Sequence, residues 1–172
     1  MKRAAGFALL LAAFIAPARA HPAPNSILSL RFLANSVDAE LLVPASELAI
    51  ARAAGAAGEV SPVALADYLL RHFGAETPGG QPWKMEIENV RATTYLDHDY
   101  FRVQLELVPP RGADTREFVL VSDMVTHEVR NHVVYVVADA ELIGALQYPA
   151  RRLDIQRPLN AQPRRPGSAP AK

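Results

Sequence analysis

Apolar and polar residues alternate along the first part of the folded chain in the way expected of strands. Residues 26–33 (SILSLRFL) and 37–43 (VDAELLV) alternate with a period of two, and residues 34–36 (ANS) between them favour a turn. Such alternation is typical of a strand with one buried face. We therefore predict a β-hairpin here.

The segment that follows the hairpin has a helical pattern instead. Residues 44–54 are rich in alanine. Further on, Ser61 and Pro62 are favoured at the cap and first position of a helix, and Gly74 favours a helix end. We predict a helical insertion at about 45–74, between the second and third strands.

The second half of the chain returns to strand-like patterns separated by turn residues. The last of them contains the run VVYVV, which is typical of a strand in the interior of a sheet. Helices do not recur between these strands, so parallel βαβ units are not expected. We predict a mainly-β fold, an antiparallel β-sandwich, in a single domain over residues 21–156. Its four later strands are predicted at residues 83–96, 100–108, 117–125 and 130–139.

The N-terminus has the layout of a secretory signal peptide. Lys2 and Arg3 supply positive charge, residues 4–15 are small or apolar, and a small-x-small cleavage site ends at Ala20. The apolar run is shorter than the roughly 20 residues that span a bilayer. We therefore predict a signal peptide at residues 1–20 and a periplasmic or secreted mature chain that begins with His21.

Composition and charge narrow the classes of function. The 172 residues include 18 basic and 18 acidic side chains and no cysteine. Loss of the predicted signal peptide removes three basic residues, which leaves 15 basic and 18 acidic and a net charge of −3. This balance argues against a nucleic-acid partner. Without cysteine, packing must stabilise the fold, and histidine is the main transition-metal ligand available. The proline-rich residues 157–172 are expected to form a disordered tail.

His21 is a candidate metal ligand because of its expected position at the mature N-terminus. Its α-amino group and imidazole would together chelate one ion, an arrangement suited to copper or nickel. Pro22 has no backbone N–H and cannot add a deprotonated amide to such a site. The alternative is a frayed terminus where cleavage left a histidine by chance.

His127 and His132 form a second candidate site. A separation of five residues places them on opposite faces of an unbroken strand. A bulge or turn between them would bring both to one side, where Asp123 would join them as a ligand; a hydrogen-bonded structural role is the alternative. We expect His98 to lie in a solvated turn and His72 to pack at the edge of a helix's buried face.

Motifs for catalysis are scarce. Ser122, Asp123 and His127 include the residue types of a hydrolase triad, but no Gly-x-Ser-x-Gly elbow, phosphate loop, dinucleotide motif or His-Glu-x-x-His motif is present. Glu86 and Glu88 alternate with apolar residues, as on the solvated face of a strand. We expect no enzymatic activity. A hydrolase remains an alternative only if Ser122 and His127 meet at an open surface.

Several segments of the predicted domain together have the features of a known family. They are residues 21–26 (HPAPNS), 37–44, 69–73 (LLRHF), 82–83 (PW) and 123–132. Over residues 21–143 they resemble the exported N-terminal domain of hydrogenase/urease accessory membrane proteins of the HupE/UreJ type. That family's membrane half is associated with nickel or cobalt transport, but here no transmembrane segment follows the β-domain. The resemblance implies an accessory domain beside a separately encoded membrane permease.

Two functions therefore remain open. In the first, the chain is a non-enzymatic exported accessory protein that binds a transition metal (Ni, Co or Cu) or a permease partner. Its candidate metal ligands are His21, Asp123, His127 and His132. In the second, it is a structural or protein-interaction β-domain without a metal role.

Overall fold

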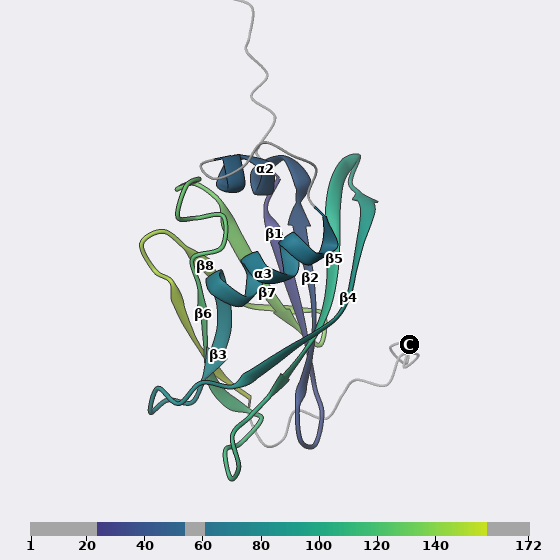
Figure 1. Ribbon diagram of the computed structural model, residues 1–172. Helices are drawn as coiled ribbons and strands as arrows, with labels where there is room; N and C mark the ends of the chain where they lie inside the picture. Colours follow the sequence, from purple (N-terminus) through teal and green to yellow (C-terminus); the bar gives the residue numbers. More distant parts are fainter. Residues whose placement is uncertain (1–23, 54–60, 158–172) are drawn as a thin grey trace, which may run out of the picture.

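The computed structural model describes residues 24–53 and 61–157, and these residues form nine strands and two helices (Figure 1). None of the helices among them is long and apolar enough to cross a membrane. In chain order the elements are β1 (Ser26–Phe32), β2 (Val37–Pro44), α2 (Ala45–Ala53), α3 (Pro62–His72), β3 (Phe73–Glu76), β4 (Lys84–Tyr95), β5 (His98–Val108), β6 (Glu117–Ser122), β7 (Val133–Ala138), β8 (Glu141–Gln147) and β9 (Arg152–Gln156).

The strands form two sheets, as predicted for a mainly-β sandwich-like fold with a helical insertion between the second and third strands. The larger sheet has the order β4-β5-β2-β1-β7-β8 and the smaller one the order β3-β6-β9. One feature differs from the prediction of a purely antiparallel fold, because β1 pairs with β7 in parallel. The chain reaches β7 from β6 of the smaller sheet, so no hairpin turn joins β7 to β1 and the two strands can pair in parallel.

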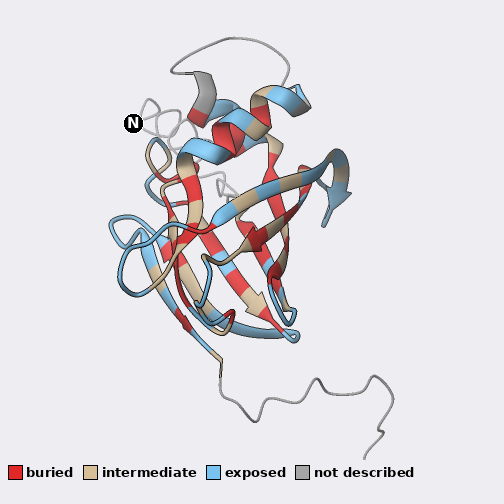
Figure 2. Ribbon diagram, turned by 60° about the horizontal axis from the view of Figure 1, so that its bottom comes forward, coloured by how far each residue is buried: buried red, intermediate tan, exposed pale blue. Residues whose placement is uncertain are grey.

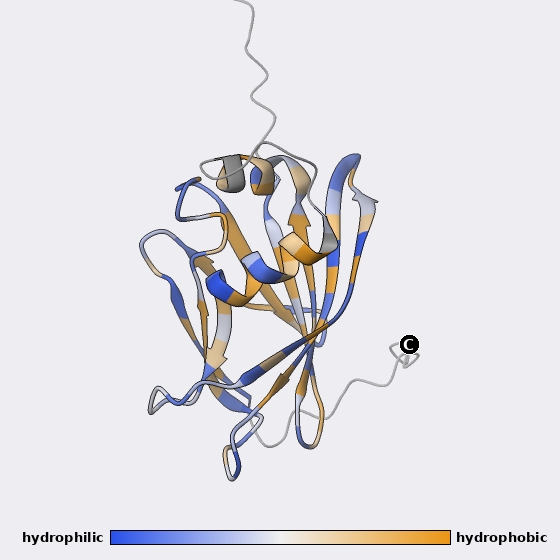
Figure 3. Ribbon diagram, viewed as in Figure 1, coloured by the Kyte–Doolittle hydropathy of each residue, from blue (hydrophilic) through white to orange (hydrophobic). Residues whose placement is uncertain are grey.

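The core lies between the two sheets and under the helices (Figures 2 and 3). Alternation along β1 buries Leu28 and Leu30, and Leu28 lies opposite Leu41 of β2. The smaller sheet contributes Phe118 and Leu120 from β6. Each fully buried side chain of this size stabilises the fold by about 1.5–3 kcal/mol.

Both helices cover an end of this core. Helix α3 begins as predicted, with Ser61 as its cap and the Ser61 Oγ accepting a hydrogen bond from the Ala64 N–H at 3.2 Å. Its end differs from the prediction: the helix stops at His72, and Phe73 is already extended (φ −142°, ψ 143°). The chain therefore passes directly from α3 into β3, and Gly74 is not a left-handed cap.

The strand predictions differ from the structure mainly in three missed strands and two boundaries. Strands β3, β8 and β9 had no predicted counterpart. The strand predicted at 117–125 ends at Ser122, and the one predicted at 130–139 begins at Val133. Between these two strands the chain makes a series of turns. The predicted signal peptide and most of the predicted tail lie outside the described residues.

Candidate metal centre

The pairing of β3 with β6 brings His72 next to Asp123. The two strands are antiparallel, and Phe73 lies opposite Ser122. His72, directly before Phe73, therefore lies beside Asp123, directly after Ser122. The backbone confirms this: the His72 carbonyl accepts hydrogen bonds from the N–H groups of Asp123 (3.1 Å) and Met124 (3.2 Å).

The Asp123 carboxylate is held from two sides. His72 Nδ1–H donates to its Oδ1 at 2.8 Å, and the Arg151 guanidinium donates from Nη1 to its Oδ2 at 2.9 Å. The side chains of His72 and Asp123 are only 24% and 27% exposed, so these contacts are partly shielded from water. Charge-assisted hydrogen bonds of this kind fix the orientation of the carboxylate.

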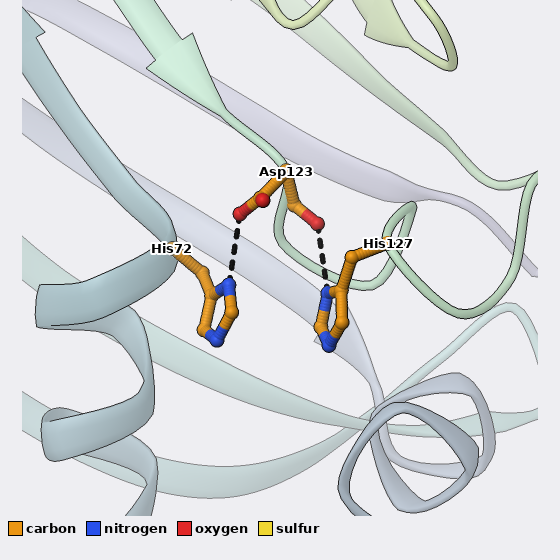
Figure 4. Close-up of side chains that lie close together, drawn as sticks. All are labelled: His72, Asp123 and His127. Carbon is orange, nitrogen blue, oxygen red and sulfur yellow. Dashed lines mark hydrogen bonds and ion pairs between the residues drawn. The ribbon is translucent and has the colours of Figure 1, made fainter. Parts of the chain in front are cut away.

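His127 joins the group through a single turn of chain. Its backbone N–H and its Nδ1–H both donate to the Asp123 carbonyl, each at 3.0 Å. The turn places the His127 ring face to face with the His72 ring, at 4.4 Å between ring centroids and 7° between planes. Figure 4 shows both Nδ1 atoms directed toward Asp123 and both Nε2 atoms directed away from it.

Tyr68 of α3 supports the turn that carries His127. Its hydroxyl accepts a hydrogen bond from the Val125 N–H at 2.7 Å, and its ring packs 4.6 Å from the His72 ring. Val125 has a left-handed backbone (φ 62°), which is unusual for a β-branched residue and costs about 1–3 kcal/mol. The surrounding contacts therefore have to hold this turn in place.

The three side chains together offer a set of metal ligands. One ligand atom from each of His72, Asp123 and His127 lies within 4.8 Å of the other two, and no other such group occurs in the described parts of the chain. Nitrogen and carboxylate ligands lie about 2.0–2.2 Å from a transition metal, so two ligands in neighbouring positions are about 3 Å apart. The 2.8 Å between His72 Nδ1 and Asp123 Oδ1 is close to this spacing. Imidazole with carboxylate suits nickel, cobalt, copper or zinc.

The structure brings together only part of the predicted ligand set. Asp123 and His127 lie together as predicted, but the third member is His72, which we expected to have only a packing role. His132 does not join them, and His21 lies outside the described residues. His98 lies beside the two-residue turn between β4 and β5 and is exposed.

His132 is instead buried between β1 and α2. It is 1% exposed; its Nε2 lies 2.9 Å from the Ser26 hydroxyl and its Nδ1 lies 3.9 Å from Glu47 Oε2. Burial lowers the pKa of His132 to about 4 and raises the pKa of Glu47. With its pKa near 4, His132 is uncharged at neutral pH, so it forms no ion pair with Glu47, and it matches the alternative of a hydrogen-bonded structural role.

Ser122 does not meet His127 at an open surface, as the hydrolase alternative requires. Ser122 is 3% exposed, and its hydroxyl accepts a hydrogen bond from the Met124 N–H at 3.2 Å. Asp123 orients His127 through its carbonyl and not through its carboxylate. The chemistry available at this place is therefore that of a half-buried pair of imidazoles with one carboxylate.

Comparison of the sequence with protein-family models and with curated proteins gives no match. The resemblance to the exported domain of HupE/UreJ-type proteins therefore stays a prediction from the sequence. The argument for function comes from the geometry of His72, Asp123 and His127.

Proposed function

We propose that the protein is an exported accessory protein that binds a divalent transition metal ion through His72, Asp123 and His127. One observation carries the proposal: three residues from two distant parts of the chain place a carboxylate oxygen and two imidazole nitrogens within 4.8 Å of one another. Nickel, cobalt and copper are the ions of interest, since the sequence resemblance points to the first two and the ligand types suit all three.

The hydrogen bonds within the site indicate which contacts a bound ion would replace. The proton on His72 Nδ1 lies on the line to Asp123 Oδ1, so an ion that binds both atoms replaces this proton. His127 contributes a ring nitrogen from the facing ring. Arg151 stays beside the second oxygen of Asp123 and competes with the ion for the carboxylate's charge.

Calorimetric titration with Ni(II), Co(II) and Cu(II) tests the proposal. The protein is used in a His21→Ala background, so that an N-terminal chelate does not contribute. We expect His72→Ala to weaken binding at least about tenfold, as loss of a metal ligand or of its support does. His98→Ala, an exposed histidine on the β4–β5 hairpin, serves as the matched control and retains full affinity. Equal affinities in the His72 and His98 variants would contradict the proposal.

A structural or interaction domain remains the second candidate, because the cluster satisfies its own hydrogen bonds without an ion. Both Nδ1 atoms and both carboxylate oxygens of Asp123 already have partners. In that case His72→Ala lowers the free energy of unfolding but leaves metal affinity unchanged. Denaturant unfolding of the same variants, in the presence of a chelator, separates the two functions. A separately encoded permease stays a proposed partner for either one.

A further inference from the structure

A hollow of about 370 Å³ lies beside the proposed metal centre, and two arginines are among the residues that line it. His72 and Asp123 form the side of the hollow that belongs to the centre, and Arg71 and Arg151 also line it. Arg151 pairs with Asp123, whereas Arg71 has no ion-pair partner among the described residues. A volume of this size is within the range of pockets for small molecules, roughly 300–1,000 Å³.

The charges around the hollow are poorly suited to a bare dication. Asp123 is the one carboxylate of the proposed centre, and Arg151 already neutralises it. The other carboxylate that lines the hollow, Glu76, pairs with Arg152. An ion bound at the centre would therefore lie near the Arg151 guanidinium, beside a hollow that Arg71 also lines, with little negative charge to balance it. Like charges repel more strongly where water is partly excluded.

An anionic ligand on the metal removes this imbalance. Three protein ligands leave coordination positions open on Ni(II) or Co(II), and carboxylate oxygens can fill them. A guanidinium group also binds a carboxylate with two parallel hydrogen bonds, which gives both affinity and orientation. A single small polycarboxylate can thus contact the ion with some of its oxygens and the arginines with others.

We infer that the centre takes its metal as a complex with a small carboxylate-bearing chelator. In this arrangement His72, Asp123 and His127 bind the ion, and Arg71 and Arg151 bind the chelator's outer carboxylates. The inference rests on the proposed metal-binding function and adds the chemical class of the ligand that comes with the ion.

Equilibrium dialysis with Ni(II) and isotopically labelled citrate tests this inference. Citrate is the probe because it chelates nickel and carries additional carboxylates. We expect wild-type protein to retain about one citrate for each nickel, and to retain none without nickel. The double variant Arg71→Gln, Arg151→Gln should retain citrate at least about tenfold more weakly, the loss expected for charge-assisted hydrogen bonds.

The single variant Arg71→Gln should also retain citrate more weakly than the wild type but should bind nickel alone with unchanged affinity, because Asp123 pairs with Arg151 and not with Arg71. Loss of citrate retention without loss of nickel binding distinguishes recognition of a chelate from general damage to the fold. Arg116→Gln, which removes an exposed guanidinium paired with Asp114, is the matched control and should change neither result.

Two other outcomes are possible: one overturns the chelate inference alone, and the other overturns the proposed metal binding as well. If citrate only strips nickel from the protein, equally in wild type and double variant and with no citrate retained, the chelate inference is wrong while metal binding stands. If the wild type binds nickel neither with nor without citrate, the proposed metal function fails as well.

Discussion

Protonation of the buried His132 ring makes the free energy of unfolding depend on pH. Burial lowers its pKa to about 4, from the ordinary histidine value of 6.5 that applies in the unfolded chain. Between these two values the unfolded chain binds a proton that the folded protein does not, so stability is full above pH 6.5 and decreases as the pH falls toward 4. A shift of this size corresponds to up to about 3 kcal/mol. Glu47, whose pKa is raised by burial, acts in the opposite direction and offsets part of this effect.

We therefore expect His132→Gln to reduce the loss of stability between pH 6.5 and about 4. Urea unfolding of the wild type and the variant at both pH values measures this, and the comparison cancels the contributions of the remaining carboxylates. His98→Gln, at an exposed position, should keep the pH dependence of the wild type. An unchanged pH dependence in His132→Gln would show that another group is responsible.

The candidate site could be predicted in part because two of its residues are close in sequence. Asp123 and His127 are four residues apart, and the polar segment around them interrupts two apolar strands. The direction of the His132 side chain depends on the turns that lead from Asp123 to His132. These turns contain the left-handed Val125, a conformation that no sequence pattern indicates for a β-branched residue. The role of His72 depends on the register between β3 and β6, and therefore could not be read from its own helix.

At the scale of elements, Tyr68 connects helix α3 to the turn that carries His127. Its hydroxyl is the hydrogen-bond acceptor for the buried Val125 N–H. We expect Tyr68→Phe to lower the free energy of unfolding by about 1–3 kcal/mol, the usual cost of a buried polar group left without a partner. Metal affinity should fall as well, because the turn that aligns His127 with His72 loses a support.

Tyr135→Phe is a suitable comparison for this variant, because Tyr135 lies on β7 and is 38% exposed. Thermal unfolding and nickel titration of both variants provide the measurements. If the two substitutions have the same small effect, then the Tyr68 hydroxyl does not hold the turn.

The elements predicted correctly are those with a strong local signal. The first hairpin alternates cleanly, and Ser61 with Pro62 marks the beginning of α3. Strand β3 was missed because it has four residues and follows the helix without a break. Strand β8 was missed because its alternation is weak: Leu142 and Ile143 are adjacent and both exposed. Strand β9 alternates, but it has only five residues, and its place in the fold depends on pairing with β6, which is distant in the chain.

At the scale of the whole molecule, the proposed centre lies where separate parts of the fold meet. His72 lies at the junction of α3 and the smaller sheet, and Asp123 begins the connection from that sheet to β7. Unfolding separates these residues, which are 51 positions apart in the chain. An ion bound by both therefore binds the native fold and not the unfolded chain.

This arrangement predicts that metal stabilises the entire domain. A ligand that binds only the native state adds about 2.7 kcal/mol at a hundredfold excess over its dissociation constant and about 4.1 kcal/mol at a thousandfold excess. We expect the melting temperature to rise steadily with the logarithm of the nickel concentration in the His21→Ala protein. The same series with His72→Ala added should show a comparable rise only at nickel concentrations at least about tenfold higher, while His98→Ala should behave as its parent. An equal rise in the His72 variant at the same nickel concentrations would place the stabilising ion elsewhere on the molecule, because loss of a ligand at the proposed centre must weaken the linkage between binding and folding.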